Sequence, residues 1–217
     1  MCNIIPGILE KDWESIETKI NQVKDFSKVI HIDIIDGKFA ENQTFLDPKP
    51  FAKYTKDYLF ELHMMVEEPV NYLKPFADAG FKRFLGHVEK MSDQAEFVAE
   101  GQILGEVGLA IDGPTSVDAI KVSLEDIDVI LIMTIKAGFS GQEFIEEHLR
   151  KIEMLKKRFI EENVLRIPVL EVDGGINERT ISSARDKGAL RFVSTSYVFR
   201  DSPYEQFKKL KLLGRRG

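Results

Sequence analysis

Four residues with metal-binding side chains lie at or near the ends of short apolar runs in this sequence. His31 and Asp33 occur in IHIDIIDG, His63 occurs in ELHMMV, and Asp173 occurs in EVDGG. Turn or polar residues follow each run, a pattern that predicts the end of a β-strand. Two imidazoles and two carboxylates suit a borderline divalent cation better than they suit packing. The spacing therefore predicts one metal site built where several strands end.

Eight apolar runs of this kind recur along the chain, and we interpret them as strands. They are Asn3–Leu9, Lys28–Ile34, Tyr58–Met65, Arg83–Val88, Glu106–Ile111, Asp128–Ile135, Pro168–Val172 and Leu190–Ser194. Amphipathic stretches of helical period separate most of them; the helices expected are Asp12–Val23, Ile145–Phe159, Arg179–Lys187 and Pro203–Leu213. Strands that alternate with helices imply parallel pairing through βαβ crossovers.

A closed barrel and an open doubly wound sheet both fit this alternation. Eight units in 217 residues favour an α/β fold of the (β/α)8 TIM-barrel type, in a single domain over residues 1–217. An open dinucleotide-binding sheet would need a glycine fingerprint after its first strand, where this chain has PGIL at positions 6–9.

Alternation within the strands places the candidate ligands inside the barrel. His31 and Asp33 share one face, and the isoleucines at positions 30, 32 and 34 take the other, which suits packing against helices. Glu61 and Glu171 each lie two positions before a candidate ligand, so they should also point inward. We interpret both carboxylates as hydrogen-bond acceptors that orient the imidazoles, with a metal-free buried ion pair as the alternative.

The remaining histidines are less telling. His87 and Glu89 repeat the spacing of two at the end of the fourth predicted strand, and the residues alone leave a structural and a functional role equally open. His148 follows two glutamates and is interpreted as a solvated helix residue.

Composition limits the class of protein. Apolar residues make up 43% and charged residues 30% of the chain, as in ordinary globular domains, and the net charge is −6. This negative charge argues against general binding to nucleic acid or to an anionic membrane surface. The single cysteine, Cys2, excludes an intrachain disulfide, and no apolar run reaches transmembrane length. With no signal-peptide pattern at the start, a cytoplasmic location is expected.

Three loops late in the chain have the small residues that anion sites use. They are Gly138-Phe139-Ser140-Gly141, Gly174-Gly175 and Ser194-Thr195-Ser196. Glycine lets backbone N–H groups approach an anion, and barrel enzymes often bind phosphate at the loops after the last two strands. Each loop alone is more often a simple turn, so the indication of a phosphate site comes from all three together.

Four segments together resemble the ribulose-phosphate 3-epimerase family of phosphate-binding barrels. Residues 31–37, HIDIIDG, look like the family's H-x-D-x-M-D-G, and residues 61–66, ELHMMV, look like D-x-H-L-M-V. Residues 133–142, MTIKAGFSGQ, are similar to M-[ST]-V-x-P-G-F-G-G-Q, and residues 171–176, EVDGGI, are close to E-V-D-G-G-[VI]. The match covers nearly the whole chain, and these motifs in this order are highly specific.

The resemblance implies an isomerase that converts D-ribulose 5-phosphate to D-xylulose 5-phosphate, a pentose phosphate pathway reaction, by inverting C3. His31, Asp33, His63 and Asp173 would bind one divalent metal ion, which in this family is zinc, iron, manganese or cobalt. Asp33 and Asp173 would also be the two acid/base groups, on opposite faces of the sugar, with a metal-stabilised enediolate between them. The residues that would contact the substrate are Gly7, His63, Met65, Met133, Gly138, Phe139, Ser140, Gly141, Gly174, Gly175, Thr195 and Ser196. A homo-oligomer is also expected, since the family often forms dimers or larger assemblies.

The chain departs from the family pattern around the substrate, whereas the metal and acid/base positions are intact. Gly7 stands in place of a serine, Ser140 in place of a glycine, and Thr195 in place of the glycine of the last phosphate loop. The Thr195 side chain would either crowd the phosphate or donate a hydrogen bond to it. Asp112 would add negative charge near the mouth, and Lys136 would add positive charge near the phosphate loop.

Three other functions remain open from the sequence. One is a 3-epimerase of another ketose phosphate, such as a hexulose 6-phosphate. A second is a non-catalytic phosphosugar-binding protein, although such a protein has no need of two opposed carboxylates. The third, an aldol-type relative such as hexulose-phosphate synthase, would carry D-x-K-x-x-D on the second strand, where this chain has His31 and Asp33.

Overall fold

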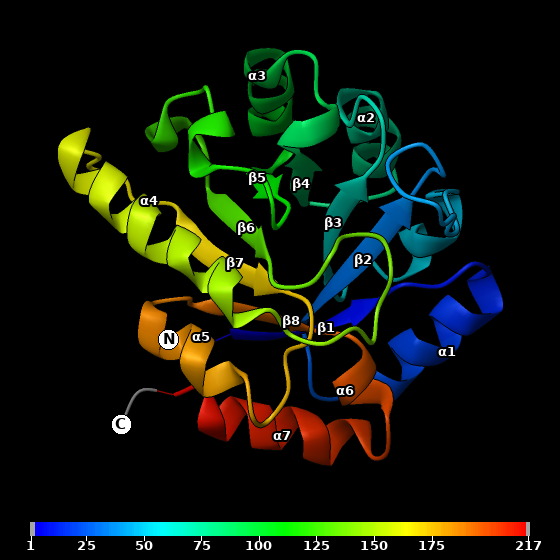
Figure 1. The fold of residues 1–217 in the computed structure, drawn as a ribbon. Helices are drawn as coiled ribbons and strands as arrows, with labels where there is room; N and C mark the ends of the chain where they lie inside the picture. Colours follow the sequence, from blue (N-terminus) through cyan, green and yellow to red (C-terminus); the bar gives the residue numbers. More distant parts are fainter. Residues whose placement is uncertain (1–2, 216–217) are drawn as a thin grey trace.

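Eight parallel strands close into a barrel in the computed structural model, which describes residues 3–215 (Figure 1). Each strand pairs with the next in sequence, and β1 also pairs with β8. All eight predicted strands are confirmed, each to within two residues at either end. The strands are β1 (Asn3–Ile8), β2 (Val29–Ile35), β3 (Leu59–Met65), β4 (Arg83–His87), β5 (Glu106–Ile111), β6 (Val129–Met133), β7 (Val169–Asp173) and β8 (Arg191–Ser194). Cys2 lies outside the described residues.

Helices surround the barrel, but they do not follow every strand (Figure 1). The α-helices are α1 (Trp13–Val23), α2 (Val70–Asp78), α3 (Gln94–Leu104), α4 (Arg150–Glu161), α5 (Ile181–Lys187), α6 (Ser196–Phe199) and α7 (Pro203–Leu213). The connections after β2 and β5 contain only 3-10 turns, at Lys49–Lys53, Val117–Ala119 and Leu124–Asp126. No helix within residues 3–215 is long and apolar enough to cross a membrane.

The four predicted helices are present, with local differences. Helix α1 begins where expected because the Asp12 carboxylate accepts a hydrogen bond from the Ser15 N–H at 2.8 Å, satisfying a free donor of the first turn. The helix predicted over Ile145–Phe159 starts instead as a 3-10 turn at Glu146–Leu149 and continues as α4. His148 in this turn is half-buried, and its Nδ1 lies 3.0 Å from the Met133 carbonyl oxygen, so the prediction of a solvated residue is wrong.

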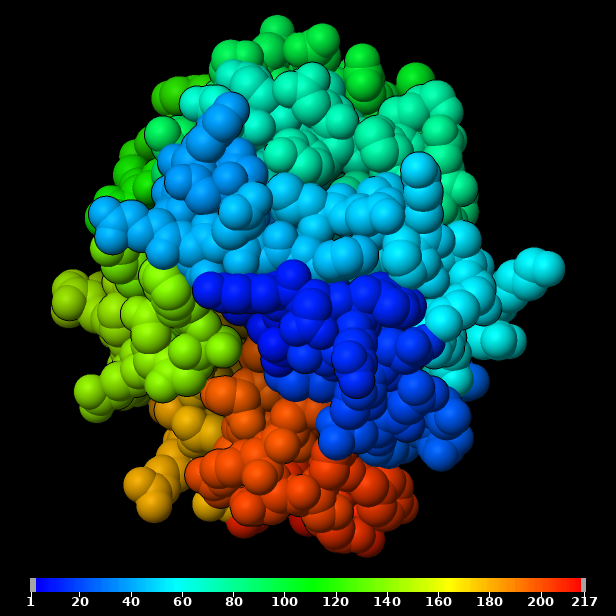
Figure 2. Space-filling model, turned by 90° about the vertical axis from the view of Figure 1, so that its right-hand side faces the viewer, coloured from blue at the N-terminus to red at the C-terminus, as the bar shows by residue number. Residues whose placement is uncertain are grey.

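The ends of the chain meet on one side of the barrel. Figure 2 shows the N-terminal part of the chain, in blue, lying directly against the C-terminal helices, in orange to red. Phe26, which follows α1, packs on Tyr204 and Phe207 of α7, with ring centroids 5.7 and 4.9 Å apart. These contacts join α7 to the segment between α1 and β2. The pairing of β1 with β8 brings residues from the two ends of the sequence into the same site.

The strand faces divide as the alternation predicts. Ile30, Ile32 and Ile34 belong to the large apolar layer between barrel and helices. His31 and Asp33 point the other way and are 0% and 3% exposed. A second apolar cluster fills the barrel interior, with Ile35, Met65, Leu85, Ala110, Val129, Leu131, Met133, Ile135 and Ala137. The barrel interior is therefore a packed apolar core. Buried ionisable groups, among them His31 and Asp33, lie toward the end of the barrel formed by the carboxyl ends of the strands.

Candidate metal centre and phosphate pocket

The four predicted ligands converge at the carboxyl ends of β2, β3 and β7. One nitrogen or oxygen atom from each of them lies within 4.8 Å of the others. Asp33 Oδ1 is 3.2 Å from His31 Nε2 and 2.8 Å from His63 Nδ1, and Asp173 Oδ2 is 3.6 Å from His63 Nδ1. Strand pairing brings Asp33 directly beside His63, while Asp173 comes from β7. All four side chains are buried.

This donor set fits a divalent cation. Two imidazole nitrogens and two carboxylate groups are ligands that zinc, iron, manganese and cobalt accept, and two carboxylates neutralise a charge of +2. Burying two carboxylates this close together is costly unless a positive charge lies between them. The cluster therefore meets the chemical requirement for a metal site.

Glu61 orients His31 from below. Its Oε1 lies 2.6 Å from His31 Nδ1, so this nitrogen carries the proton and donates it, which leaves Nε2 to face the cluster. Its other oxygen accepts a hydrogen bond from Arg83 Nη1 at 2.7 Å, and Arg83 Nε donates to Glu106 at 2.7 Å. The prediction for Glu61 agrees with this geometry.

The prediction for Glu171 is wrong. Its Oε1 is 3.9 Å from His31 Nδ1, and neither carboxyl oxygen has a hydrogen-bond partner among the described residues. The Nδ1–H of His31 makes one short hydrogen bond, and Glu61 accepts it. Burial and the negative charge of Glu61 raise the pKa of Glu171 well above its usual value, which favours the neutral acid.

His87 and Glu89 orient the second imidazole. Glu89 Oε2 lies 2.9 Å from His87 Nδ1, and His87 Nε2 lies 2.9 Å from His63 Nε2. Burial lowers the pKa of His87, so its ring is neutral: Nδ1–H donates to Glu89, and Nε2 accepts from His63. His63 Nδ1 then faces the cluster, where it lies 2.8 Å from Asp33 Oδ1 and would offer its lone pair to a bound cation. These contacts favour an orienting role for His87 and Glu89, and Phe39 covers His87 with its ring centroid 4.6 Å away.

Replacing His87 by phenylalanine is expected to weaken metal binding by about tenfold, because the acceptor that fixes the His63 ring is lost while the ring volume is kept. Competition of the purified protein with a chelator for Zn²⁺ measures this change. Glu147→Gln, which removes one charge of an exposed ion pair with Arg150, is the matched control and should bind as wild type. Equal affinity in His87→Phe and wild type would show that the ring contact has no orienting role.

The two aspartates differ in acidity before a cation binds. Burial raises the pKa of Asp33, but the nearby His31 and His63 more than offset this and bring it well below its usual range. Burial and the negative charge of Asp33 raise the pKa of Asp173 to about 6. Burial lowers the pKa of His31, yet the Asp33 and Glu61 carboxylates raise it well above normal. A cation that binds His31 Nε2 must therefore displace a proton.

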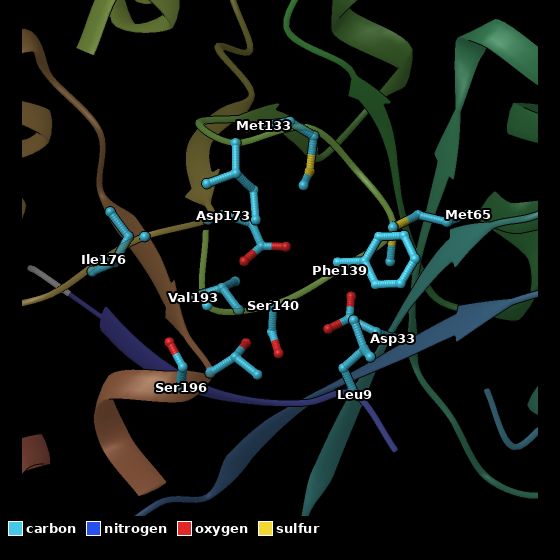
Figure 3. A pocket seen from close by; sticks show the side chains of 16 residues that line it. Leu9, Asp33, Met65, Met133, Phe139, Ser140, Asp173, Ile176, Val193 and Ser196 are labelled. Carbon is cyan, nitrogen blue, oxygen red and sulfur yellow. The ribbon is translucent and has the colours of Figure 1, made fainter. Parts of the chain in front are cut away.

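A pocket opens directly above this cluster (Figure 3). Asp33 and Asp173 project into it from opposite sides, and Met65 and Met133 form part of its wall (Figure 3). Ten of the predicted substrate-contact residues line it: Met65, Met133, Gly138, Phe139, Ser140, Gly141, Gly174, Gly175, Thr195 and Ser196. The pocket also has four apolar lining residues that sequence reasoning missed: Leu9, Ile135, Ile176 and Val193. Gly7 and His63 do not line the pocket.

The glycine loops form the far side of this pocket. Gly174 has a φ of 111°, and a Cβ added there would lie 2.9 Å from the backbone nitrogen of Ile135, so only glycine fits. The Asn42 amide donates to the Gly138 carbonyl oxygen at 2.8 Å and ties the loop after β6 to the loop after β2.

Comparison with known proteins agrees with this arrangement. Residues 3–199 match the family described as the Ribulose-phosphate 3 epimerase family. The chain belongs to this family. Ribulose-phosphate 3-epimerase from Schizosaccharomyces pombe is 34% identical over 97% of this chain and 92% of its own length. The Bacillus subtilis ribulose-phosphate 3-epimerase is 32% identical over 93% of this chain and 94% of its own length. A rice (Oryza sativa subsp. japonica) relative, named ribulose-phosphate 3-epimerase, cytoplasmic isoform, is 31% identical over 91% of this chain and 87% of its own length.

Epimerases of this family are isomerases that act on carbohydrates, which confirms the enzyme class predicted from the motifs. Solved structures confirm the barrel. KGPDC from Streptococcus mutans has a TM-score of 0.70 over 99% of this chain and 97% of its own. A 3-hexulose-6-phosphate synthase from Salmonella typhimurium has a TM-score of 0.65 over 97% of each chain. At 13% identity in both cases, these likenesses concern the fold alone.

Proposed function

We propose that this protein is a metal-dependent epimerase that interconverts D-ribulose 5-phosphate and D-xylulose 5-phosphate by inverting C3. The observation that carries the proposal is the placement of Asp33 and Asp173, which enter one pocket from opposite sides beside two oriented imidazoles (Figure 3). Family membership supports the reaction class.

Inversion of a carbon needs two proton carriers. A single base would return the proton to the face from which it was taken, whereas carboxylates on opposite sides of the sugar can take it from one face and supply it to the other. In the direction of xylulose 5-phosphate, one aspartate accepts the C3 proton, and the other, in its acid form, donates a proton to the opposite face. The reverse direction exchanges these roles.

Four residues would hold the cation: His31 through Nε2, His63 through Nδ1, and one oxygen each from Asp33 and Asp173. A divalent ion bound there supplies Lewis-acid stabilisation of the negative charge that develops on the substrate oxygens. The protein's own contribution is to orient the imidazoles through Glu61 and His87 and to keep water away.

The remaining pocket residues bind and enclose the sugar phosphate. Met65 and Met133 are 1% and 2% exposed, and their apolar side chains exclude water from the reacting carbon. The loops around Gly138 and Gly174 would hold the phosphate through backbone N–H groups, and Phe139, which is half exposed, would cover it.

The decisive experiment is proton NMR in heavy water with ribulose 5-phosphate and added Zn²⁺, Fe²⁺, Mn²⁺ or Co²⁺. We expect the C3 proton signal to disappear as xylulose 5-phosphate appears, and we expect a chelator to stop both changes. Binding of the sugar phosphate with no loss of the C3 signal under any of these metals would favour a non-catalytic phosphosugar-binding protein.

A second candidate function keeps the chemistry and changes the sugar. Ser140 and Thr195 both line the pocket, where the family has glycines, and this observation favours a 3-epimerase with a different ketose phosphate preference, such as a hexulose 6-phosphate. Comparing kcat/KM for pentulose and hexulose phosphates decides between the two. We also propose a homo-oligomer in the cytoplasm, which sedimentation and fractionation of cells can test.

A further inference from the structure

Gly7 and Thr195 occupy adjacent positions on the inner face of the barrel. Strand β1 runs parallel to β8 in a register that pairs Pro6 with Ser194, so Gly7 lies beside Thr195. On its other side Gly7 pairs with the candidate metal ligand His31 of β2. A Cβ built on Gly7 would collide with Thr195 Oγ1 and lie 2.8 Å from Cγ1 of Val193. The Thr195 side chain therefore fills the space that a side chain at position 7 would need.

Glycine at position 7 is explained by this neighbour and not by the backbone. Its φ lies outside the left-handed region, in contrast to that of Gly174, so an L-residue could adopt the same backbone conformation. The restriction on residue 7 is thus steric and comes from two neighbours on β8 and just after it, Val193 and Thr195. Gly7 and Thr195 both depart from the family pattern. The two departures look independent in the sequence, but the two residues share the same side-chain space in the structure.

The Thr195 hydroxyl is free to bind a ligand. Among residues 3–215 it has no hydrogen-bond partner, whereas the hydroxyl of the preceding Ser194 donates to the Ile176 carbonyl oxygen at 2.9 Å. Thr195 is half-buried and lines the same pocket as Asp33, Asp173 and Gly175. The same pocket therefore brings Thr195 together with two of the candidate metal ligands and with the glycine loops, and its strand neighbour Gly7 pairs with a third ligand, His31.

We propose that the Thr195 hydroxyl contacts the sugar chain of the bound ketose phosphate, at a hydroxyl group between the reacting carbons and the phosphate. The Thr195 side chain occupies the space beside Gly7 that a larger residue 7 would fill. Only one of the two positions can therefore provide a polar contact to the substrate, and in this chain it is Thr195. This inference rests on the proposed function for the identity of the ligand. It assigns Thr195 to substrate recognition, and not to crowding of the phosphate.

The test uses four variants that differ by single groups. Thr195→Val keeps the shape and removes the hydroxyl. The double variant Gly7→Ser with Thr195→Gly moves the hydroxyl to the other strand, and Gly7→Ala with Thr195→Gly is its matched control, with the same contact to Val193 but no hydroxyl. Gly7→Ser alone retains the collision with Thr195. The measurements are kcat/KM for ribulose 5-phosphate, calorimetric binding of an unreactive pentitol 5-phosphate, Zn²⁺ affinity and melting temperature.

Loss of one hydrogen bond is expected to lower kcat/KM and pentitol phosphate affinity of Thr195→Val by about fivefold, with Zn²⁺ affinity unchanged. The serine double variant should exceed its alanine control by a similar factor. Gly7→Ser alone should melt at a lower temperature than the same change combined with Thr195→Gly. Equal binding and turnover in Thr195→Val and wild type, or in the two double variants, would overturn the proposal.

These outcomes are separable from failure of the proposed function. A wild-type protein that binds pentitol 5-phosphate without epimerising ribulose 5-phosphate refutes the epimerase, and a binding loss of about fivefold in Thr195→Val then still supports the contact. A wild-type protein that epimerises while Thr195→Val binds and turns over equally well refutes the contact alone.

Discussion

Asp33→Asn and Asp173→Asn are each expected to lower kcat for ribulose 5-phosphate by about 100-fold to 10,000-fold, the usual contribution of a positioned acid or base. Asparagine keeps the size and one oxygen of the side chain but cannot carry the proton. The two carboxylates enter the pocket from opposite sides, so neither can replace the other (Figure 3). Rates of xylulose 5-phosphate formation measure the loss. Asp78→Asn, at an exposed ion pair with Lys74, is the control and should keep full activity.

Isotope exchange separates loss of a base from loss of the metal. In heavy water, the variant that retains the base for ribulose 5-phosphate should still exchange its C3 proton slowly without making the other epimer. The other variant should exchange only the C3 proton of xylulose 5-phosphate. Metal content is measured alongside, because both aspartates also belong to the predicted ligand set. Full activity in either variant would contradict the two-base mechanism.

Arg83→Ala is expected to destabilise the fold by about 3–5 kcal/mol, since it leaves a buried carboxylate without its partner. Glu61 is 0% exposed, and Arg83 Nη1 donates to it at 2.7 Å while Arg83 Nε donates to Glu106. The free energy of unfolding from denaturant titration of the metal-free protein measures the effect. Glu61 accepts the hydrogen bond from His31 Nδ1–H, so a Glu61 side chain that moves would no longer fix the orientation of the His31 ring. We therefore expect Arg83→Ala to weaken metal binding as well.

Lys74→Ala gives the matched comparison. Lys74 also pairs with a carboxylate, Asp78, but both side chains are more than half exposed, and such surface pairs contribute about 0–1 kcal/mol. We therefore expect Lys74→Ala to change the free energy of unfolding by less than about 1 kcal/mol. A loss below about 1 kcal/mol for Arg83→Ala would show that water or another group compensates Glu61 when the guanidinium is removed.

The sequence carries most of the information about the strands and the ligands. Each strand is a short apolar run bounded by turn residues, and a period of two places His31 and Asp33 inside once Ile30 and Ile32 are outside. The helices are less predictable. After β2 and β5 the chain forms 3-10 turns, and after β5 it does so although the buried Val117, Ile120, Leu124 and Ile127 have the spacing of a helical face.

The sequence does not predict which side chains from different strands form hydrogen bonds with each other. Glu61 and Glu171 have the same local pattern, yet one bonds to His31 and the other has no hydrogen-bond partner among the described residues. The stacked pair of His63 and His87 depends on where two strand ends meet, which no spacing within either strand records. Sequence reasoning therefore found the groups of the site but not the hydrogen bonds that set their orientation.

The adjacency of Gly7 and Thr195 also restricts how such a site can change by single replacements. A serine at position 7 and a threonine at position 195 would overlap, because a Cβ on Gly7 already collides with Thr195. Glycine at both positions would leave only a gap. A lineage that moves the hydroxyl from β1 to β8 therefore passes more easily through glycine at both positions than through serine with threonine. The intermediate would lack one contact and still fold. Ancestral reconstruction of positions 7 and 195 should recover that order of events.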